Sequence, residues 1–170
     1  MSKIVFVCTA NICRSPAAEA IARSRFSGVG HSFASAGFLY EGRQAESDMV
    51  KALAEVAVDA SGHRSRIISL ENADEAYHIL TMESRHVQDI AVMSPDLFAK
   101  TLPLVEAHER LAGRRIDTAE FVAGLASRNP MSYFDTRWDV EDPYKRSKRK
   151  YRKSVEQISE LVASVVPALS

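Results

Sequence analysis

Apolar runs of strand length alternate with helical patterns along the first part of this chain. The run from Ile4 to Val7 is continuous and rich in β-branched residues, as in a parallel strand buried on both faces. We therefore predict a strand over Lys3–Cys8. A helix is predicted from position 16 to about 27, where small apolar residues recur on one face, and a second strand over His31–Ala36.

The same patterns continue to the C-terminus. They predict a helix capped by Ser47, whose inward-facing residues are Met49, Leu53, Val56 and Ala57. A helical turn capped by Ser69, a strand over Ala76–Leu80 and a helix from Met82 to about Val92 follow. On the last predicted helix one face is apolar and consists of Tyr151, Val155, Ile158, Leu161, Val162 and Val165.

The segment between these helices is less regular. Lys100–Leu104 fits an edge strand or the start of a helix that runs to Leu111. The rest of the segment is predicted to form a short helix capped by Asp117 or Thr118 and ending near Arg128, followed by a long irregular loop over Asn129–Tyr144.

Strands that alternate with helices predict an α/β protein whose parallel sheet carries helices on both faces. The 170 residues are about one domain, and no repeat or Pro/Gly/Ser-rich linker divides them. Lys plus Arg and Asp plus Glu both number 22, so no net charge points to nucleic acid or to a membrane surface. The apolar stretches are too short to span a bilayer. We expect one domain over residues 1–170 in a soluble cytoplasmic protein.

The junction between the first strand and the first helix has a distinctive composition. It reads Cys8, five residues, Arg14 and Ser15, with Ser15 as a plausible N-cap and Pro16 in the first turn. A strand–loop–helix of this kind directs backbone N–H groups and a helix N-terminus to one point, which suits a tetrahedral dianion. A cysteine below that point is favoured as a reactive thiolate, and a guanidinium can bind two oxygens of the anion.

This segment, Cys8-Thr9-Ala10-Asn11-Ile12-Cys13-Arg14-Ser15-Pro16, resembles the active-site loop of the low-molecular-weight protein tyrosine phosphatase family. The resemblance implies a flavodoxin-like fold of three layers, with a four-stranded parallel sheet between helices. It extends from Ile4 to about His86 and returns at Val140–Tyr144 and the last helix. Residues 101–130 do not match the family's sequence pattern well, and we expect a partly helical insertion there.

The resemblance implies a cysteine-dependent phosphatase that hydrolyses phosphotyrosine in proteins. Cys8 is expected to attack phosphorus and form a phosphocysteine, while Arg14 and the loop amides stabilise the phosphate charge. The Ser15 hydroxyl can donate to the Cys8 thiolate. The residues assigned to phosphate and substrate binding are Thr9, Ala10, Asn11, Ile12, Cys13 and Ser15 of the loop, together with Tyr40 and Tyr144.

The leaving group needs a proton, so a carboxylic acid must reach the loop. In the family this acid directly precedes a proline near the C-terminus. Asp142, followed by Pro143, matches that pattern and is the predicted general acid, with Asp139 and Glu141 as runners-up.

Two polar residues are predicted to support the loop. The Asn11 side chain is expected to bind loop backbone and keep the loop open, and His63 resembles the family histidine that supports this asparagine. The other four histidines are scattered, and their spacing suggests no metal site. We expect catalysis without a metal or a cofactor.

The sequence leaves the identity of the phosphorylated substrate residue undecided. Tyr144, Tyr40, Phe38 and Leu39 can wall a slot for an aromatic ring. Ile12 resembles the phosphotyrosine branch, whereas related arginine phosphatases carry threonine there, so phosphoarginine is the alternative substrate. A catalytically idle phosphopeptide-binding module is the alternative from another class.

Two further features bear on regulation and partners. Cys8 and Cys13 lie in one loop, which favours a reducing compartment and a redox-sensitive site in which a disulfide between them protects Cys8. Seven of the nine residues over Lys145–Lys153 are basic, which either favours substrates acidic around the phosphosite or marks a solvated helix. We expect a monomer whose partners are a phosphotyrosine protein and a tyrosine kinase.

Overall fold

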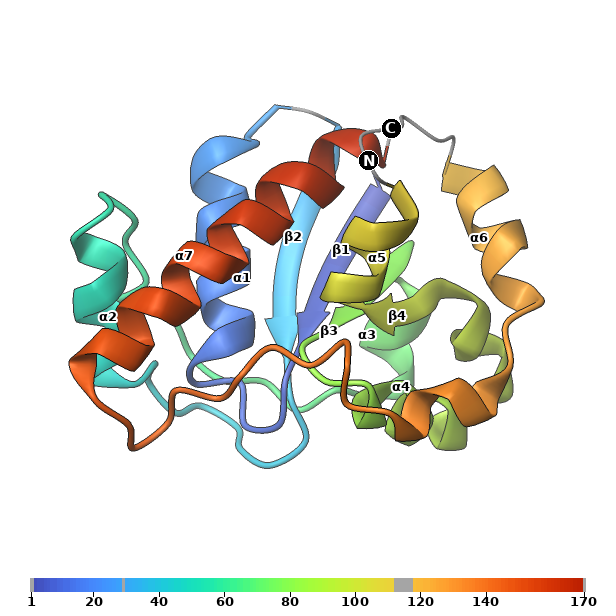
Figure 1. Cartoon of the computed structure of the whole chain (residues 1–170), viewed down its shortest axis with the longest axis horizontal. Helices are drawn as coiled ribbons and strands as arrows, with labels where there is room; N and C mark the ends of the chain where they lie inside the picture. The colour runs from blue at the N-terminus through green and yellow to red at the C-terminus, as the bar shows by residue number, and fades with distance from the viewer. Residues whose placement is uncertain (1, 29, 112–117, 170) are drawn as a thin grey trace.

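Four parallel strands form one sheet at the centre of the protein (Figure 1). The computed structural model describes residues 2–28, 30–111 and 118–169. The strands are β1 (Ser2–Val7), β2 (His31–Ala36), β3 (His78–Thr81) and β4 (Thr101–Pro103), in the spatial order β2-β1-β3-β4. This is the α/β architecture that the alternation of patterns predicts.

The central strand β1 is buried on both faces. Ile4 is paired with Phe33 of β2 on one side and with His78 of β3 on the other. Ile4 and Phe6 belong to one apolar core and Val5 and Val7 to another, on opposite faces of the sheet. Because neither face meets water, the strand reads as a continuous apolar run and not as an alternating one.

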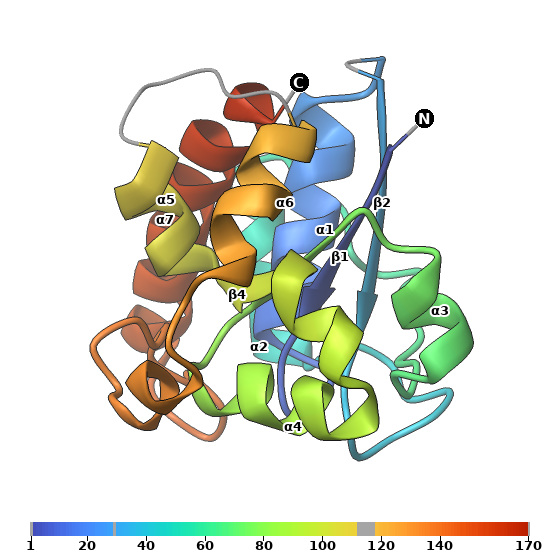
Figure 2. The same ribbon diagram turned by 90° about the vertical axis from the view of Figure 1, so that its right-hand side faces the viewer.

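Helices cover both faces, as the view turned by 90° shows (Figure 2). On one face lie α1 (Arg14–Arg25), α2 (Ser47–Ala54), α5 (Leu104–Leu111) and α7 (Lys148–Val165), while α3 (Leu70–Asp74), α4 (Arg85–Met93) and the 3-10 helix η1 (Pro95–Lys100) lie on the other. Beyond β4 lie α6 (Thr118–Ala126) and the 3-10 turn η2 (Pro130–Phe134), and η3 (Val166–Ala168) ends α7.

The order of the strands determines where a ligand can bind. The chain passes from β1 to β2 on one side and then returns to β3 on the other side of β1. In open α/β sheets the crevice at such a reversal, beyond the carboxyl ends of the strands, is the usual ligand site. The loop that begins at Cys8 follows β1 directly and lies at this point.

A buried ion network holds the segment that follows β4. Glu106 of α5 accepts hydrogen bonds from Arg110 at 2.6 Å and from the Tyr133 hydroxyl at 2.7 Å. Arg128 donates to that hydroxyl and to the carbonyls of Phe98 and Thr101. Helix α5, Arg128 and Tyr133 are therefore joined to β4 by polar contacts that a periodicity argument does not reveal.

Several boundaries differ from the sequence predictions. Helix α1 begins at Arg14 with Cys13 as its N-cap residue, so Ser15 is not the cap, and α2 is preceded by Glu46, so Ser47 is not the cap either. Helix α2 ends at Ala54, which leaves Val56 46% exposed and Ala57 exposed, contrary to the inward positions predicted for them. The Ser69 cap is confirmed.

The partly helical insertion predicted for residues 101–130 includes one strand of the central sheet. Residues 101–103 form β4, the fourth strand of the sheet, and α5 and α6 account for the predicted helical content. The strand and the helix considered for residues 100–111 both exist, one after the other. The proposed cap at Asp117 lies outside the described residues. No helix in the part of the chain that the structure describes is long and apolar enough to cross a membrane.

Candidate active site

The loop that follows β1 lies tightly against the segment that follows β2. A Cβ at Gly37 would meet the Asn11 nitrogen at 2.8 Å and the Cys8 carbonyl oxygen at 2.9 Å, so only glycine fits there. Phe38 N donates to the Thr9 carbonyl at 2.8 Å. Asn11 itself has a φ of 53°, in the left-handed region that asparagine tolerates. These contacts fix the curvature of the loop.

A cavity of about 140 Å³ opens at this loop. It is lined by Cys8, Thr9, Ala10, Ile12, Cys13, Arg14, Leu39, Tyr40, Asp142 and Tyr144. Cavities of about 150 Å³ hold a benzene ring, so the space suits one aromatic ring. The structure therefore brings together the three residues predicted to be catalytic and most of those predicted to bind substrate.

The Cys8 sulfur is buried and has a hydroxyl beside it. Its Sγ lies 3.0 Å from Ser15 Oγ, and Asn11 Nδ2 donates to the same Ser15 oxygen at 2.8 Å. A thiolate has no proton to give, so with Cys8 ionised the Ser15 hydroxyl is the donor to sulfur. The alternative acceptor, the Ala36 carbonyl, is farther away at 3.3 Å.

The Asn11 side chain does not bind loop backbone as predicted. Its Oδ1 accepts from the Arg66 backbone N–H at 2.8 Å, and its Nδ2 donates to Ser15 and to Ser35. The side chain is fully buried. Asn11 thus joins the loop to the helix, the second strand and a distant connection at once.

Two residues extend this support away from the cavity. His63 Nε2 lies 2.8 Å from the Asn11 carbonyl oxygen, so the predicted histidine does contact the predicted asparagine. Burial lowers the pKa of His63, although its hydrogen bond to that carbonyl acts in the opposite direction. Ser35, which accepts from Asn11, donates in turn to Glu19 at 2.6 Å.

Arg14 lies in a cluster of opposite charge. Its side chain is 2% exposed, and Nη2 contacts Glu83 at 2.6 Å and Asp142 at 3.0 Å, while Nη1 donates to the Val140 carbonyl at 2.9 Å. Burial opposes the positive charge, but Cys8, Asp142 and Glu83 outweigh it and raise the pKa of Arg14. Its Nε is buried with no hydrogen-bond partner in the described part of the chain. An oxygen of a bound oxyanion would satisfy that donor.

Glu83 is a site residue that the sequence analysis missed. It follows β3 by two residues, and Arg14 and Arg85 lie on either side of its carboxylate. Burial opposes ionisation of Glu83, but Arg14 and the Arg85 hydrogen bond outweigh it and lower the pKa of the carboxyl. Its position in the sequence could have indicated this role. Glu83 follows the strand that pairs with β1, and adjacent parallel strands end at the same edge of the sheet.

The segment that carries Asp142 is joined to the sheet by its backbone. Val140 N donates to the Met82 carbonyl at 2.8 Å, just beyond the end of β3. Asp142 Oδ1 accepts from Tyr144 N at 3.2 Å, while Oδ2 faces Arg14. The carboxylate thus reaches the cavity from a segment more than a hundred residues away along the chain.

The runner-up carboxylates point elsewhere. Asp139 accepts from Ser84 N at 2.7 Å, and Glu141 pairs with Lys150 at 2.7 Å. Neither lines the cavity. Pro143 is buried and does not line the cavity.

Two tyrosines form the aromatic part of the cavity wall. Tyr40 and Tyr144 are both partly exposed, and the Arg43 guanidinium lies 4.3 Å from the centre of the Tyr40 ring. Phe38 does not line the cavity, contrary to the prediction, because its ring stacks on His86 at 5.3 Å.

A larger cleft, of about 730 Å³, lies behind the loop, where it reaches Glu19, Ser35 and His63. Neither Cys8 nor Arg14 lines it, so it is not the reaction site. Within the described ranges, no group of three or more His, Cys, Asp or Glu side chains could hold a metal ion.

Comparison with known proteins points to one family. The family described as low molecular weight phosphotyrosine protein phosphatase matches residues 3–120, which includes part of the segment that sequence inspection left unmatched. The chain is 34% identical over 101 residues to the low molecular weight protein-tyrosine-phosphatase Etp of Escherichia coli (strain K12), covering 59% of this chain and 68% of Etp. It is 31% identical over 162 residues to the protein-arginine-phosphatase of Geobacillus stearothermophilus, covering 94% of this chain and 90% of that protein.

Solved structures resemble the whole chain. The low molecular weight protein tyrosine phosphatase from T. tengcongensis has a TM-score of 0.77 at 28% identity and covers 99% of this chain and 100% of its own. The YwlE arginine phosphatase from Geobacillus stearothermophilus has a TM-score of 0.75 at 28% identity, covering 98% of this chain and 92% of its own.

Proposed function

Because this chain belongs to the low-molecular-weight phosphotyrosine protein phosphatase family, and is an enzyme of that class, we propose that it hydrolyses phosphotyrosine in proteins through a phosphocysteine intermediate. The observation that carries the proposal is one cavity in which Cys8, Arg14 and Asp142 converge. A protein that only binds phosphopeptides needs the loop amides and Arg14 to hold the phosphate, but it has no use for a carboxylate on the leaving-group side.

In the first step the Cys8 thiolate attacks phosphorus and the bond from phosphorus to the tyrosine oxygen breaks. Ser15 holds the thiolate through its hydroxyl, and Arg14 and the loop amides bind the equatorial oxygens. Asp142, in its protonated form, gives its proton to the departing phenolate.

In the second step the same carboxylate acts as a base. Asp142 takes a proton from a water molecule whose oxygen attacks phosphorus. The sulfur–phosphorus bond breaks, which releases inorganic phosphate and restores the Cys8 thiolate. No electrons are transferred to or from an external partner.

The cavity wall supports tyrosine as the phosphorylated residue. Its volume suits one aromatic ring, and Tyr40 and Tyr144 offer ring faces to a phenyl group. Ile12 is buried and apolar. It resembles the phosphotyrosine branch of the family, whereas related arginine phosphatases carry threonine at that position.

Phosphoarginine is the second candidate, because the matched arginine phosphatase covers 94% of this chain. The test is to compare kcat/KM on phosphotyrosine and phosphoarginine peptides of the same sequence, in wild type and in Ile12→Thr. We expect a preference for phosphotyrosine of at least about a hundredfold in wild type, reduced in the variant. A preference for phosphoarginine in wild type would reverse the assignment.

The covalent step is tested at Cys8. Cys8→Ser should lower kcat by at least about a thousandfold while phosphate or vanadate binds within a few-fold of wild type. Rapid quenching of wild type with an aryl phosphate should trap phosphate on sulfur, measured by mass spectrometry. Turnover by Cys8→Ser near the wild-type rate would show that the nucleophile lies elsewhere.

We further propose that residues 1–170 form one phosphatase domain that acts as a monomer. Its partners in this proposal are phosphoproteins made by a tyrosine kinase. A cytoplasmic location follows from the need to keep Cys8 as a free thiolate; both cysteines are free in the structure.

A further inference from the structure

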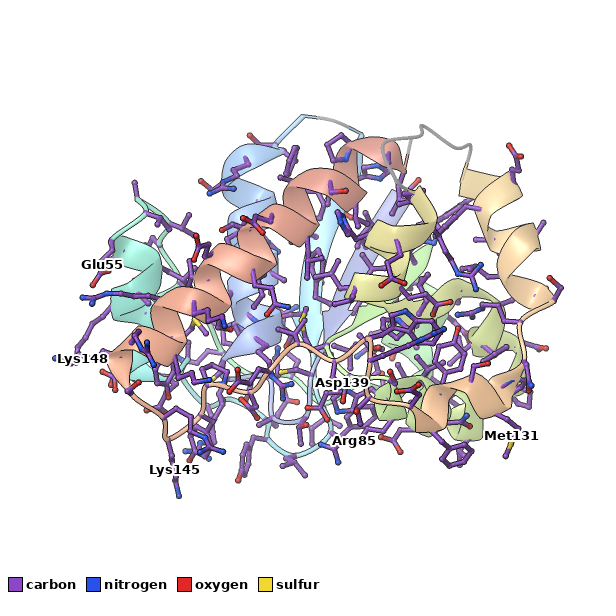
Figure 3. All side chains as sticks on the ribbon, viewed as in Figure 1. Glu55, Arg85, Met131, Asp139, Lys145 and Lys148 are labelled. Atoms are coloured by element: carbon purple, nitrogen blue, oxygen red, sulfur yellow. The ribbon has the colours of Figure 1, made fainter. Side chains whose placement is uncertain are left out.

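A second cavity, of about 270 Å³, lies beside the catalytic one. It is lined by Ser84, Arg85, Gln88, Asp89, Tyr133, Phe134, Asp135, Thr136 and Asp139. The two cavities are joined by a hydrogen bond, because Arg85 Nη2 of the second donates to Thr9 of the first at 2.8 Å. Their linings are also close in sequence: Ser84 follows Glu83, which binds Arg14, and Asp139 precedes Val140, whose carbonyl accepts from Arg14. Figure 3 shows Arg85 and Asp139 near each other at the edge where the strands end.

This second cavity carries net negative charge. Three carboxylates, those of Asp89, Asp135 and Asp139, face one cation, Arg85. That cation is already engaged, because Arg85 Nε contacts Glu83 at 2.5 Å and Nη2 donates to Thr9 at 2.8 Å. Such a cavity attracts a positively charged group.

A buried hydroxyl gives independent evidence of a ligand. Ser84 is 1% exposed and lines the cavity, yet its Oγ has no hydrogen-bond partner among the residues that the structure describes. Buried hydroxyl groups are normally paired, because an unmade hydrogen bond is costly. A hydroxyl can accept from an ammonium or guanidinium N–H, so a cationic guest would satisfy it.

The other features of the cavity suit an organic cation. Phe134 lines it and is 71% exposed, so its ring is accessible to the aliphatic part of a long basic side chain. Partial burial raises the pKa of Asp89, with Arg85 acting in the opposite direction, and a bound cation would offset that burial. The described carboxylates do not converge closely enough for three of them to hold a metal ion.

The distance between the cavities matches a short peptide. Asp139 is three residues from Asp142, so their Cα atoms lie at most about 11 Å apart along an extended chain. Three residues of an extended peptide span the same length. A side chain up to three positions from the phosphorylated residue can therefore reach the second cavity.

We propose that the cavity formed by Ser84, Asp89, Phe134, Asp135 and Asp139 binds a lysine or arginine side chain located one to three residues from the phosphorylated tyrosine. This inference rests on the proposed phosphatase function and makes the cavity a specificity subsite of the enzyme. In Figure 3, Lys145 and Lys148 of the basic stretch at positions 145–153 lie to the left of Asp139, which lines the cavity.

The test uses phosphotyrosine peptides that carry one lysine at each of the three positions on either side, compared with norleucine at the same position. Norleucine keeps the aliphatic stem and removes the charge. We expect kcat/KM in wild type to be about fivefold to tenfold higher for lysine at one or more positions. Asp89→Asn/Asp135→Asn should abolish that ratio and leave kcat/KM on p-nitrophenyl phosphate unchanged.

A matched control removes two carboxylates far from the cavity. Glu156→Gln/Glu160→Gln on the exposed side of α7 changes the net charge equally and should keep the lysine preference. Ser84→Ala should reduce the preference without altering the p-nitrophenyl phosphate rate.

The outcomes separate the inference from the proposed function. Equal rates for lysine and norleucine peptides, in an enzyme that turns over both, would overturn the subsite alone. A lysine preference that survives Asp89→Asn/Asp135→Asn, or that the α7 control also loses, would do the same. An enzyme that hydrolyses no phosphotyrosine substrate would overturn both proposals.

Discussion

Arg14 faces two carboxylates before any phosphate has bound, and this shapes how the site can work. Glu83 is partly buried and is shared with Arg85, so it stays beside the guanidinium. Asp142 is 47% exposed and approaches the same nitrogen less closely. A phosphate dianion entering the cavity repels both, and Asp142 is the one free to move. We therefore expect substrate binding to turn Asp142 from the arginine toward the leaving-group oxygen.

The role of Asp142 is tested with a series of leaving groups. Asp142→Ala should lower kcat by about 10²–10⁴ for phosphate esters of poor leaving groups, and far less for activated aryl phosphates that need no proton. Glu141→Gln is the matched control and should show no such dependence, because Glu141 faces Lys150. An equal loss on all esters in Asp142→Ala would assign the acid to another residue.

Cys13 lines the same cavity as Cys8. Burial, followed by the charges of Asp142 and Cys8, raises the pKa of the Cys13 thiol, so in the resting enzyme at neutral pH Cys13 is protonated. Peroxide would oxidise the Cys8 thiolate to a sulfenic acid, which removes the Cys8 charge that helps to raise the pKa of Cys13. The Cys13 sulfur, on losing its proton, would then attack the sulfenic sulfur, forming a disulfide and releasing water.

This reaction sequence predicts that wild type and Cys13→Ser recover different fractions of their activity after oxidation. After peroxide treatment, dithiothreitol should restore most of the activity of wild type but only a small fraction of that of Cys13→Ser, because an unprotected sulfenic acid is oxidised further. The measurement is residual kcat/KM on an aryl phosphate. Equal recovery of the two proteins would exclude a protective disulfide.

At the scale of elements, α7 combines a well-packed apolar face with an unusual first turn. Val155, Ile158 and Val162 are buried against the sheet side of the helix. Basic residues at a helix N-terminus oppose the helix dipole. Lys150 and Arg152 are offset by Glu141 and Glu55, the latter in two hydrogen bonds.

The remaining basic residues of this stretch are the ones to test for substrate attraction. Neutralising Lys145, Arg146, Lys148 and Arg149 together leaves both ion pairs in place. In wild type, kcat/KM for an acidic phosphotyrosine peptide should fall more steeply with salt than for a neutral one, and the variant should lose that difference, because surface fields are screened over about 10 Å at 0.1 M salt. Identical salt slopes in wild type would mean that the stretch is solvated helix surface.

At the scale of the whole molecule, the two ends of the sheet differ in chemistry. The carboxyl ends of the strands carry the charged groups of the site, Arg14, Glu83 and Asp142. The opposite end carries His78, fully buried in β3 with both ring nitrogens lacking hydrogen-bond partners in the described structure, edge-on to Phe121. Burial, with smaller effects of His31 and Lys100, lowers the pKa of His78 to about 4.

This buried histidine predicts how stability depends on pH. The unfolded chain takes up the proton near pH 6.5, while the folded protein resists until about pH 4, so the free energy of unfolding falls as pH decreases across that window. Above pH 6.5 the stability is complete. At about 1.4 kcal/mol per pKa unit the loss is on the order of 3 kcal/mol.

Urea unfolding at several pH values between 4.5 and 7 measures this effect. His78→Phe should flatten the slope, although not fully, since burial also lowers the pKa of His86 to about 4. If wild type and His78→Phe lost stability equally across the window, His78 would not be the cause.

Helices, strands and caps could be predicted where the pattern that indicates them lies within a few neighbouring residues. The continuous apolar run of β1, the periodic apolar face of α7 and the Ser69 cap each depend on neighbours within a few residues. The caps assigned to Ser15 and Ser47 were wrong, because each hydroxyl can bind several partners and the fold decides which is in reach. Ser15 faces Cys8 instead of a helix amide.

The loop from Cys8 to Arg14 could be recognised without a structure, since the thiol, the loop amides and the guanidinium lie within seven positions of one another. That Glu83 binds this arginine, that Asn11 reaches Ser35 and that a carboxylate-lined cavity adjoins the site became visible only in the folded chain. The physical reason is that a side chain's direction depends on the register of strands and the packing of helices, which join residues far apart along the chain. Asp142 was within reach of prediction only through its family resemblance, because 128 positions separate it from Arg14.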